Sequence, residues 1–302
     1  MFQLLTVGNI TVDLYFKGKT LPMKDKLFQL ACGSKYIAEE FHEGLGGGAA
    51  NVAIGASNQG LNCAVLAKVG ENVFKQIVLQ KLVNKRISTE FLIYDRKFKN
   101  ISSIFLSPGG ERSLVHFTTP HTSFDLSDLQ KQSMLKYSSI YFSHLSGVSF
   151  EEKLSLVSFF KKNGKRILLN IGIDDARLPK RKIHAYIQHA DTLILNRREF
   201  ATLVGKQPAR LNLEKNVAEY IKFKEKLLVI TDGSHGSFAY QEGKVYIQKS
   251  SNLKTIIDCT GAGDAYTSGF LAAYLKDNMI QDCMKAGTEY SAKILSRLGA
   301  NA

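Results

Sequence analysis

The second half of the chain alternates short apolar runs with amphipathic segments, and this alternation restricts the fold more than any other feature of the sequence. The pattern predicts helices over residues 125–135, 149–162, 178–189, 197–204 and 212–225, and strands over 138–143, 165–171, 191–195 and 227–231. Strands that alternate with helices favour a parallel sheet covered by helices. We therefore predict an α/β fold, a mostly parallel sheet with helices on both faces.

The first 120 residues only partly follow this pattern. Residues 3–8 and 62–69 are predicted strands, and residues 72–85 form a predicted amphipathic helix. Residues 14–45 are irregular, and strands at 90–95, 101–106 and 112–118 have no helices between them, with a turn signal at residues 107–110. We expect the strands at 90–95, 101–106 and 112–118 to pair with the 14–45 segment as one small sheet. A hairpin near 236–248 and helices near 261–276 and 280–298 are predicted to close the chain.

Composition places the chain among ordinary globular proteins, with 44% of its 302 residues hydrophobic and 22% charged. No apolar run approaches the length of a membrane span, and the first residues lack the features of a signal peptide. The four cysteines, Cys32, Cys63, Cys259 and Cys283, form no CxxC pair and no zinc-like cluster with histidine. We expect free thiols in a reducing cytoplasm and no membrane partner.

The formal net charge of +13 raises the question of a nucleic-acid partner. The basic residues are spread along the chain in small groups, such as 161–162, 180–182 and 197–198, and no basic arm or helix-turn-helix pattern stands out. We therefore expect a basic surface that attracts phosphorylated small molecules, and no nucleic-acid partner.

A glycine-bearing loop over residues 258–264 leads into the predicted helix 261–276. Gly261 and Gly263 allow backbone N–H groups to converge, and the helix start adds unpaired N–H groups and a positive dipole end. Such a loop binds anions. Asp264 would repel a phosphate, but it can take the proton from a hydroxyl that attacks a bound phosphoryl group. The arrangement indicates a phosphotransferase, with a helix-capping role for Asp264 as the alternative.

Other polar and glycine-rich residues lie at predicted element ends. Asp13 follows the first strand, where α/β sheets place ligand groups, although Asp also forms turns. Three glycines at 46–48 precede a helix that carries Asn51, whose amide both donates and accepts hydrogen bonds. Close helix packing is the alternative reason for these glycines. Polar clusters at 196–199 and 231–236 follow two further strands.

Taken in order, these motifs resemble the ribokinase-like, PfkB-type carbohydrate kinase family over essentially the whole chain. Gly46 and Gly47 with Asn51 match one family motif, and residues 258–264 match the other. Between them lie the Asn-x-x-Glu of residues 196–199 and the Thr-x-Gly-x-x-Gly of residues 231–236. The resemblance implies a single domain over residues 1–302. A small β-sheet lid over about 12–45 and 90–120 would close on the substrate and often pairs two subunits as a homodimer. The remainder would form a doubly wound, mostly parallel α/β core with helices on both faces.

The resemblance also implies a role for each motif. Asp264 is the expected base, and the N–H groups of Gly261, Ala262 and Gly263 are the expected anion hole. The acceptor is expected at Asp13, Gly46, Gly47 and Asn51. ATP is expected at Asn196, Thr231, Gly233, Ser234, Gly236 and Gly263, with Glu199 contacting Mg²⁺ through water. Asp258 and Thr260 match positions that bind a monovalent cation such as K⁺.

Several positions depart from the family pattern. Asn170 stands where many members have Asp, and Gly48 stands where ribokinases carry Lys. Ser143 and His144 fall where ribokinases carry a substrate-binding Glu. These differences argue against ribose as the substrate. The segment after the last helix, residues 298–302, lacks the tail that completes the cation site, so we expect weak or absent activation by potassium.

We therefore predict an ATP-dependent kinase that phosphorylates a hydroxyl of a sugar or sugar-like small molecule. A nucleoside kinase of the adenosine type is the alternative, because it would share the fold and both motifs and differ in the pocket beneath the lid. A non-catalytic nucleotide- or sugar-binding regulator is a more distant alternative, since a binder has no use for a carboxylate beside phosphate. The sequence has no Gly-x-x-x-x-Gly-Lys-Ser/Thr loop and so is not a P-loop kinase.

Overall fold

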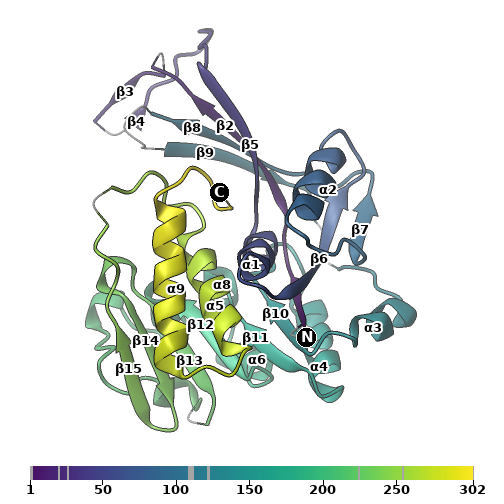
Figure 1. The fold of residues 1–302 in the computed structure, drawn as a ribbon, viewed down its shortest axis with the longest axis vertical. Coiled ribbons are helices and arrows are strands. Elements are labelled where there is room, and N and C mark those ends of the chain that lie inside the picture. The colour runs from purple at the N-terminus through teal and green to yellow at the C-terminus, as the bar shows by residue number, and fades with distance from the viewer. Residues whose placement is uncertain are drawn as a thin grey trace.

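The computed structural model describes residues 3–19, 21–25, 27–107, 112–120, 123–223, 225–253 and 255–301. The strands of its larger sheet are β1 (Gln3–Val7), β6 (Asn62–Gly70), β7 (Leu92–Asp95), β10 (Ser139–Phe142), β11 (Arg166–Leu169), β12 (Thr192–Asn196), β13 (Leu227–Thr231), β14 (Ser237–Gln241) and β15 (Lys244–Gln248). They form a nine-stranded sheet in the order β15-β14-β13-β12-β11-β10-β1-β6-β7 (Figure 1). Strand β1 pairs in parallel with β10 on one side and β6 on the other, so the chain winds outward in both directions. The predicted doubly wound sheet is confirmed, with an antiparallel hairpin of β14 and β15 at one edge.

Helices cover both faces of this sheet. One face carries α1 (Gly48–Ser57), α2 (Lys75–Asn84), α8 (Ala262–Tyr274) and α9 (Ile280–Leu295), and the other carries α3 (Asp128–Met134), α4 (Phe150–Lys162), α6 (Lys180–Ile187) and α7 (Arg197–Leu203). Successive side chains of a strand point to opposite faces, so Leu4 packs into the α1 and α8 side while Leu5 packs into the α4 and α6 side. The sheet therefore stands between two apolar cores, which hold its strand ends in fixed positions.

A second, smaller sheet lies beyond the carboxyl ends of the core strands (Figure 1). It consists of β2 (Thr11–Lys17), β5 (Glu40–Gly46), β8 (Asn100–Leu106) and β9 (Arg112–Thr118) in the order β5-β2-β8-β9, beside a two-stranded hairpin of β3 (Met23–Lys24) and β4 (Leu27–Phe28). Its inner face carries Asp13 and Tyr15, both buried. Its outer face carries Phe16, which packs against Phe41 and Phe105. Alternation along the strands thus separates an inner face, where Asp13 lies beside an apolar cluster of Tyr15, Ile104 and Leu106, from an outer face with packed aromatic rings.

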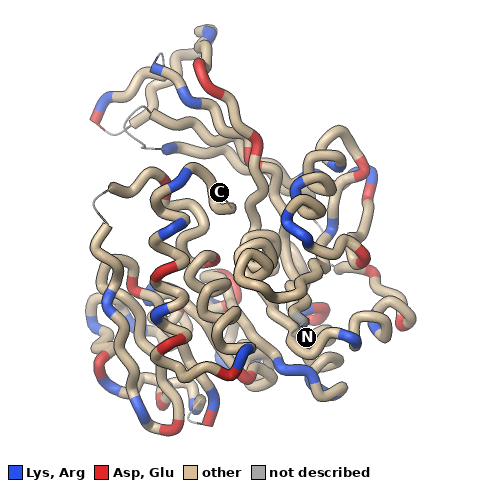
Figure 2. The backbone as a smooth tube through the Cα atoms, viewed as in Figure 1, with Lys and Arg blue, Asp and Glu red and all other residues tan. Residues whose placement is uncertain are grey.

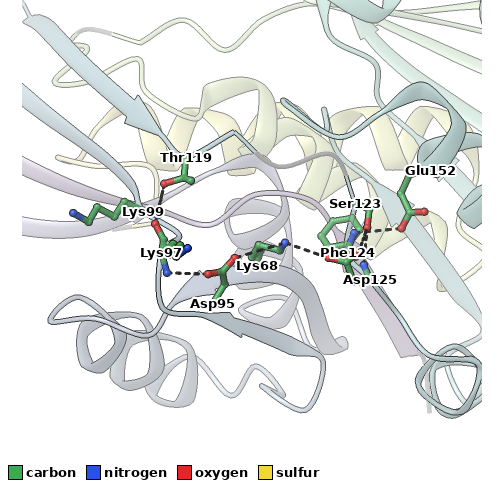
Figure 3. A network of polar contacts seen from close by, with 9 residues as sticks. All are labelled: Lys68, Asp95, Lys97, Lys99, Thr119, Ser123, Phe124, Asp125 and Glu152. Atoms are coloured by element: carbon green, nitrogen blue, oxygen red, sulfur yellow. Dashed lines mark hydrogen bonds and ion pairs between the residues drawn. The ribbon is translucent and has the colours of Figure 1, made fainter.

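The small sheet joins the core at a buried lysine (Figure 3). The Nζ of Lys68, on β6, lies 3.9 Å from an oxygen of Asp95 at the end of β7 and 3.8 Å from an oxygen of Asp125, beyond β9. The side chain of Lys68 is only 9% exposed, whereas that of Asp125 is 80% exposed. Close by, the backbone N–H of Lys99 donates to the Thr119 hydroxyl at 2.9 Å. The chain therefore enters and leaves the β8–β9 hairpin at one anchored place.

Two predictions about elements are wrong. The strand expected at 90–95 in the small sheet is β7, which pairs in parallel with β6 at the edge of the large sheet. The predicted helix at 212–225 is reduced, in the described part of that segment, to a 3-10 turn at Ala218–Ile221. The side chains of Asn212 and Asn216 accept backbone N–H bonds two residues ahead, and Lys222 has a φ of 54°. Such Asx turns and a left-handed residue compete with helix formation.

Pro108, Gly109 and Gly110 of the predicted turn lie outside the described residues. A short helix, α5 (Ile173–Ala176), was not predicted.

Charged residues of both signs are interspersed over the core and the small sheet (Figure 2). None of the helices that the structure describes is both long and apolar enough to span a bilayer.

Candidate active site

The amino end of α8 is built around a left-handed glycine. Gly261 has a φ of 71° and precedes the first helical residue, and a Cβ on it would lie 2.4 Å from Cβ of Ala300. Only glycine tolerates that torsion and that contact without strain. Next to it, a Cβ on Gly263 would meet no atom within 4 Å. The first N–H groups of a helix have no partners within it, and that of Ala262 makes only a long 3.5 Å contact with the Cys259 carbonyl, so this helix start can present backbone donors to an anion.

Asp264, in the first turn of α8, is oriented by a chain of amides. The Nδ2 of Asn51 donates to Oδ2 of Asp264 at 2.7 Å, and the Oδ1 of Asn51 accepts from Nδ2 of Asn301 at 2.8 Å. Asn301 also donates to the Leu45 carbonyl at 2.7 Å, which fixes its own orientation. Burial raises the pKa of Asp264, while the hydrogen bond from Asn51 acts against that rise. The result is a fixed carboxylate of increased basicity.

The predicted acceptor residues meet where β2, β5 and α1 come together. A Cβ on Gly46 would lie 2.3 Å from Oδ2 of Asp13, so only glycine leaves room for this carboxylate. Gly47 has a φ of 89° and a Cβ there would lie 2.3 Å from the Asn9 carbonyl oxygen. The sharp turn at Gly47 starts α1, which carries Asn51 toward Asp264. The glycines thus shape the backbone beside Asp13 and do not merely serve helix packing.

Asp13 is 4% exposed and titrates unusually. Burial raises the pKa of Asp13 to about 6, opposed by a hydrogen bond from Ser102, supported by the charge of Asp258 and opposed by that of Arg112. The group is therefore ionised at neutral pH, but only narrowly. An ionised carboxylate with little other solvation is a strong acceptor for substrate hydroxyls.

A pocket of about 620 Å³ opens on the other side of the α8 amino end. Of the predicted nucleotide residues, Thr231, Gly233, Ser234, Gly236 and Gly263 line it, together with Cys259, Ile256 and residues of α9. Gly233 and Gly236 have φ values of 54° and 95°, and a Cβ on Gly236 would lie 2.1 Å from the Gln248 carbonyl oxygen. The volume of this pocket falls within the range of small-molecule sites.

Asn196 and Glu199 form a capping box at the start of α7. The Asn196 side chain accepts from the Glu199 N–H at 2.9 Å, and the Glu199 side chain accepts from the Asn196 N–H at 2.8 Å. This pair therefore has a structural role, which the sequence argument overlooked. Asn196 also lies beside Thr231 in the β12–β13 register, at the edge of the pocket.

Glu199 nevertheless lies close enough to Asp264 for the two charges to interact. Burial raises the pKa of Glu199, and the negative charge of Asp264 adds to the rise, while hydrogen bonds from the Asn196 backbone and the Asn170 side chain oppose it. A hard cation such as Mg²⁺ prefers carboxylate oxygens and retains waters. Glu199 fits contact through such a water. Within the described ranges, no three His, Cys, Asp or Glu side chains gather as a metal centre.

Asp258 does not fit the expected monovalent cation. Its Oδ1 accepts from Nη1 of Arg112 at 2.6 Å and from both the N–H and the hydroxyl of Thr260, at 2.8 and 2.5 Å. Its Oδ2 accepts from the Gly299 N–H at 3.1 Å. Burial raises the pKa of Asp258, but these hydrogen bonds and the charge of Arg112 outweigh it, so its pKa lies below the ordinary value.

Sequence reasoning missed Arg112, Asn301 and a triad of His144, Lys153 and Asp175, of which Lys153 and Asp175 are buried. Lys153 donates to Asp175 at 2.7 Å, and Nδ1 of His144 lies 3.6 Å from the other oxygen of Asp175. The sequence held a signal for the triad, because Lys153 shares the buried face of α4 with Leu156, Val157 and Phe160. A lysine at an apolar helix position implies a buried partner. Arg112 and Asn301 lie in no recognisable pattern.

Comparison with known proteins gives a consistent result. The family model described as pfkB family carbohydrate kinase matches residues 1–302. A nucleoside kinase of Methanocaldococcus jannaschii is 26% identical over 322 residues, covering 99% of this chain and 92% of that protein. A 5-dehydro-2-deoxygluconokinase of Listeria monocytogenes is 23% identical over 310 residues, covering 98% and 90% respectively. The structure of Arabidopsis thaliana ribokinase complexed with ribose and ATP has a TM-score of 0.80 at 19% identity, covering 100% of this chain and 95% of that chain.

Proposed function

Because the chain belongs to the pfkB family of carbohydrate kinases, it phosphorylates an alcohol group, and we propose that Asp264 takes the proton from that group. The observation that carries this proposal is the position of the Asp264 carboxylate. It lies in the first turn of α8, beside open backbone donors, with Asn51 holding its Oδ2. Its Oδ1 faces the space beside Gly48, where a Cβ would lie 3.6 Å away. An acceptor hydroxyl bound there would have a base within reach.

The proposed reaction is a direct transfer. ATP lies in the pocket lined by Thr231, Gly233 and Gly236, with its terminal phosphoryl group at the α8 amino end. The acceptor oxygen attacks this phosphorus, the bond from phosphorus to ADP breaks, and the acceptor proton passes to Asp264. Backbone N–H groups of Gly261, Ala262 and Gly263 stabilise the charge on the transferring group. Mg²⁺, contacted by Glu199 through water, would neutralise phosphate charge.

We propose a polyhydroxylated sugar as the acceptor. Asp13 provides a buried carboxylate and Asn51 an amide that contacts Asp264, and both groups are suited to hydrogen bonds with neighbouring hydroxyls of one acceptor. A nucleoside is the second candidate, because the Methanocaldococcus jannaschii relative is a nucleoside kinase. The ribose hydroxyls of a nucleoside would bind to Asp13 and Asn51 in the same way.

A screen of ADP release with Mg-ATP tests both candidates, with free sugars, sugar phosphates and nucleosides as acceptors. We expect a sugar to give the highest kcat/KM, and we expect Asp264→Asn to abolish the acceptor-dependent rate. If a nucleoside gives the highest value, the second candidate replaces the first. If no acceptor accelerates ADP release, the regulator alternative gains support over both.

We also propose that the small sheet closes over the acceptor and that its outer face pairs with a second copy of the chain in the cytoplasm. Phe41, Val115 and Phe117 are 54%, 66% and 56% exposed on this sheet. Apolar groups gathered on one sheet face are typical of an interface. Light scattering after size exclusion should give the mass of a dimer, and Phe117→Ser should shift it toward the monomer, while Val73→Ser, at an exposed apolar residue elsewhere, should not. A monomeric wild type would contradict this proposal.

A further inference from the structure

The inner end of the small sheet touches the anion-binding loop through one ion pair. Arg112 is the first residue of β9, and its Nη1 lies 2.6 Å from Oδ1 of Asp258. The side chain of Asp258 is 2% exposed and that of Arg112 is 29% exposed. Arg112 also lies close enough to Asp13 to lower the pKa of that carboxyl group. The guanidinium therefore contacts the loop that leads to Gly261 and also lies within electrostatic reach of Asp13.

Among the described residues, the side-chain oxygens of Asp258 are occupied by hydrogen-bond donors and not held ready for an ion. Both of its carboxylate oxygens are already hydrogen-bonded, to Arg112, Thr260 and Gly299. The Leu295 carbonyl, which could otherwise serve as a ligand, accepts from the N–H groups of Ile257 and Asp258. A monovalent cation would have to displace a permanently charged guanidinium that makes a short hydrogen bond.

We propose that Arg112 takes the place of a monovalent cation beside the anion-binding loop, so that phosphoryl transfer depends on this arginine and not on added potassium. The inference rests on the proposed role of the loop in holding the phosphoryl group. Arg112 is here a positioning residue: it fixes Asp258, whose Oδ1 in turn holds the N–H and the hydroxyl of Thr260. That contact sets the turn into Gly261.

A tethered cation differs from a dissolved ion in one respect. A dissolved ion binds according to its concentration, whereas Arg112 arrives only when β9 is seated against the core. The loop is therefore held in shape by the same movement that closes the small sheet over the acceptor. This coupling would make the phosphoryl site complete only when the acceptor site is covered, which limits transfer of the phosphoryl group to water.

The test compares wild type with Arg112→Gln in potassium-free buffer and with potassium chloride titrated against choline chloride at constant ionic strength. Turnover uses Mg-ATP and the best acceptor of the ADP-release screen, and thermal unfolding is measured in the same buffers without substrate. We expect the wild-type rate to change less than about twofold with potassium. Arg112→Gln should lose about 10–100-fold in kcat, the scale of a misplaced transition-state contact, and potassium or guanidinium ion should restore several-fold of that rate.

Thermal unfolding provides a readout that does not need activity. Potassium, but not choline, should raise the Tm of Arg112→Gln and leave that of wild type unchanged. Lys17→Gln is the matched control, because it removes another cation of the same sheet, paired with Glu40 at 2.9 Å, away from Asp258. It should behave as wild type in both assays.

Two results would overturn the proposal. Strong, saturable activation of the wild type by potassium would show that an ion binds despite Arg112. A loss of rate in Arg112→Gln that neither ion restores, with a Tm insensitive to potassium, would show that Arg112 acts on the bound phosphates instead of through Asp258. Failure of every acceptor to support turnover would count against the proposed function alone, because the Tm comparison still decides the cation question.

Discussion

The two sheets of this kinase differ in how they are buried. The strands of the nine-stranded sheet are covered by helices on both faces, and β10 is buried at every position. In the four-stranded sheet, β8 alternates between buried and half-buried residues, and the middle of β9 is exposed. The large sheet positions Asp264 and the helix start, whereas the small sheet contributes Asp13 and Arg112. The proposed base therefore lies on the more buried part of the molecule, and the proposed acceptor carboxylate lies on the less buried sheet.

The largest effect on turnover is expected from Asp264→Asn, which changes the proposed base next to the large sheet. Asparagine keeps the size and the contact with Asn51 but cannot take the proton, so kcat should fall roughly 10²–10⁴-fold. Binding of ATP, measured by calorimetry, should change little, because the nucleotide pocket is lined by other residues. Turnover within a few-fold of wild type would reduce Asp264 to a helix cap and remove the contrast between the two sheets.

The matching change in the small sheet is Asp13→Ala, with Asn51→Ala as its partner across the acceptor site. A charge-assisted hydrogen bond contributes about 1.5–3 kcal/mol, so KM for the acceptor should rise roughly 10–100-fold. The KM for ATP should remain near that of wild type. A rise in the KM for ATP alone would show that Asp13 and Asn51 belong to the nucleotide pocket and not to the acceptor site.

Acidity should affect the small sheet in a defined direction. The pKa of Asp13 is raised to about 6 from an ordinary value of 3.8, so acceptor kcat/KM should decline as the pH falls through 6. The same shift in pKa has the opposite effect on the free energy of unfolding, which acidity increases. A raised pKa means that the folded state favours the protonated acid, so this contribution is fully present below about pH 4 and is lost as the pH rises through 6.

Asp13→Asn separates these two effects. It should be at least as stable as wild type at pH 7 in thermal unfolding, although it binds the acceptor more weakly. Wild-type acceptor kinetics that stay flat between pH 5 and pH 8 would contradict the proposed role of an ionised Asp13.

The smallest expected effect lies at the joint between the sheets. Lys68→Met keeps the length of the side chain but removes the charge that bridges Asp95 and Asp125. Both carboxylates are partly exposed, so water can solvate them, and the free energy of unfolding should fall by only about 0.5–1 kcal/mol. Hydrogen exchange should increase in β8 and β9 and remain unchanged in β10. An equal increase in both sheets would show that the joint is not a separate hinge.

The fold was predictable because its strands and helices carry clear hydrophobic periods, and the family motifs lie where backbone geometry requires glycine, as at Gly47 and Gly261. The placement of residues 90–95 was not predictable, since strand periodicity does not say which neighbour a strand chooses. The Asn212 and Asn216 turns overrode a helical pattern through side-chain hydrogen bonds. Arg112 escaped notice because its partner, Asp258, is far away in the chain, and only the folded arrangement brings them together.

The way the small sheet is threaded also sets an order of assembly. The Asn100 side chain donates to the Ile10 carbonyl across 90 positions of the chain, and β2 pairs in parallel with β8. Closing so long a loop in an unfolded chain is entropically costly. Pairing of β1 with β6 and of β6 with β7 brings the starting points of both segments together first. We therefore expect refolding to produce the helical core early and the small sheet last, so that recovery of acceptor binding lags behind recovery of helical signal.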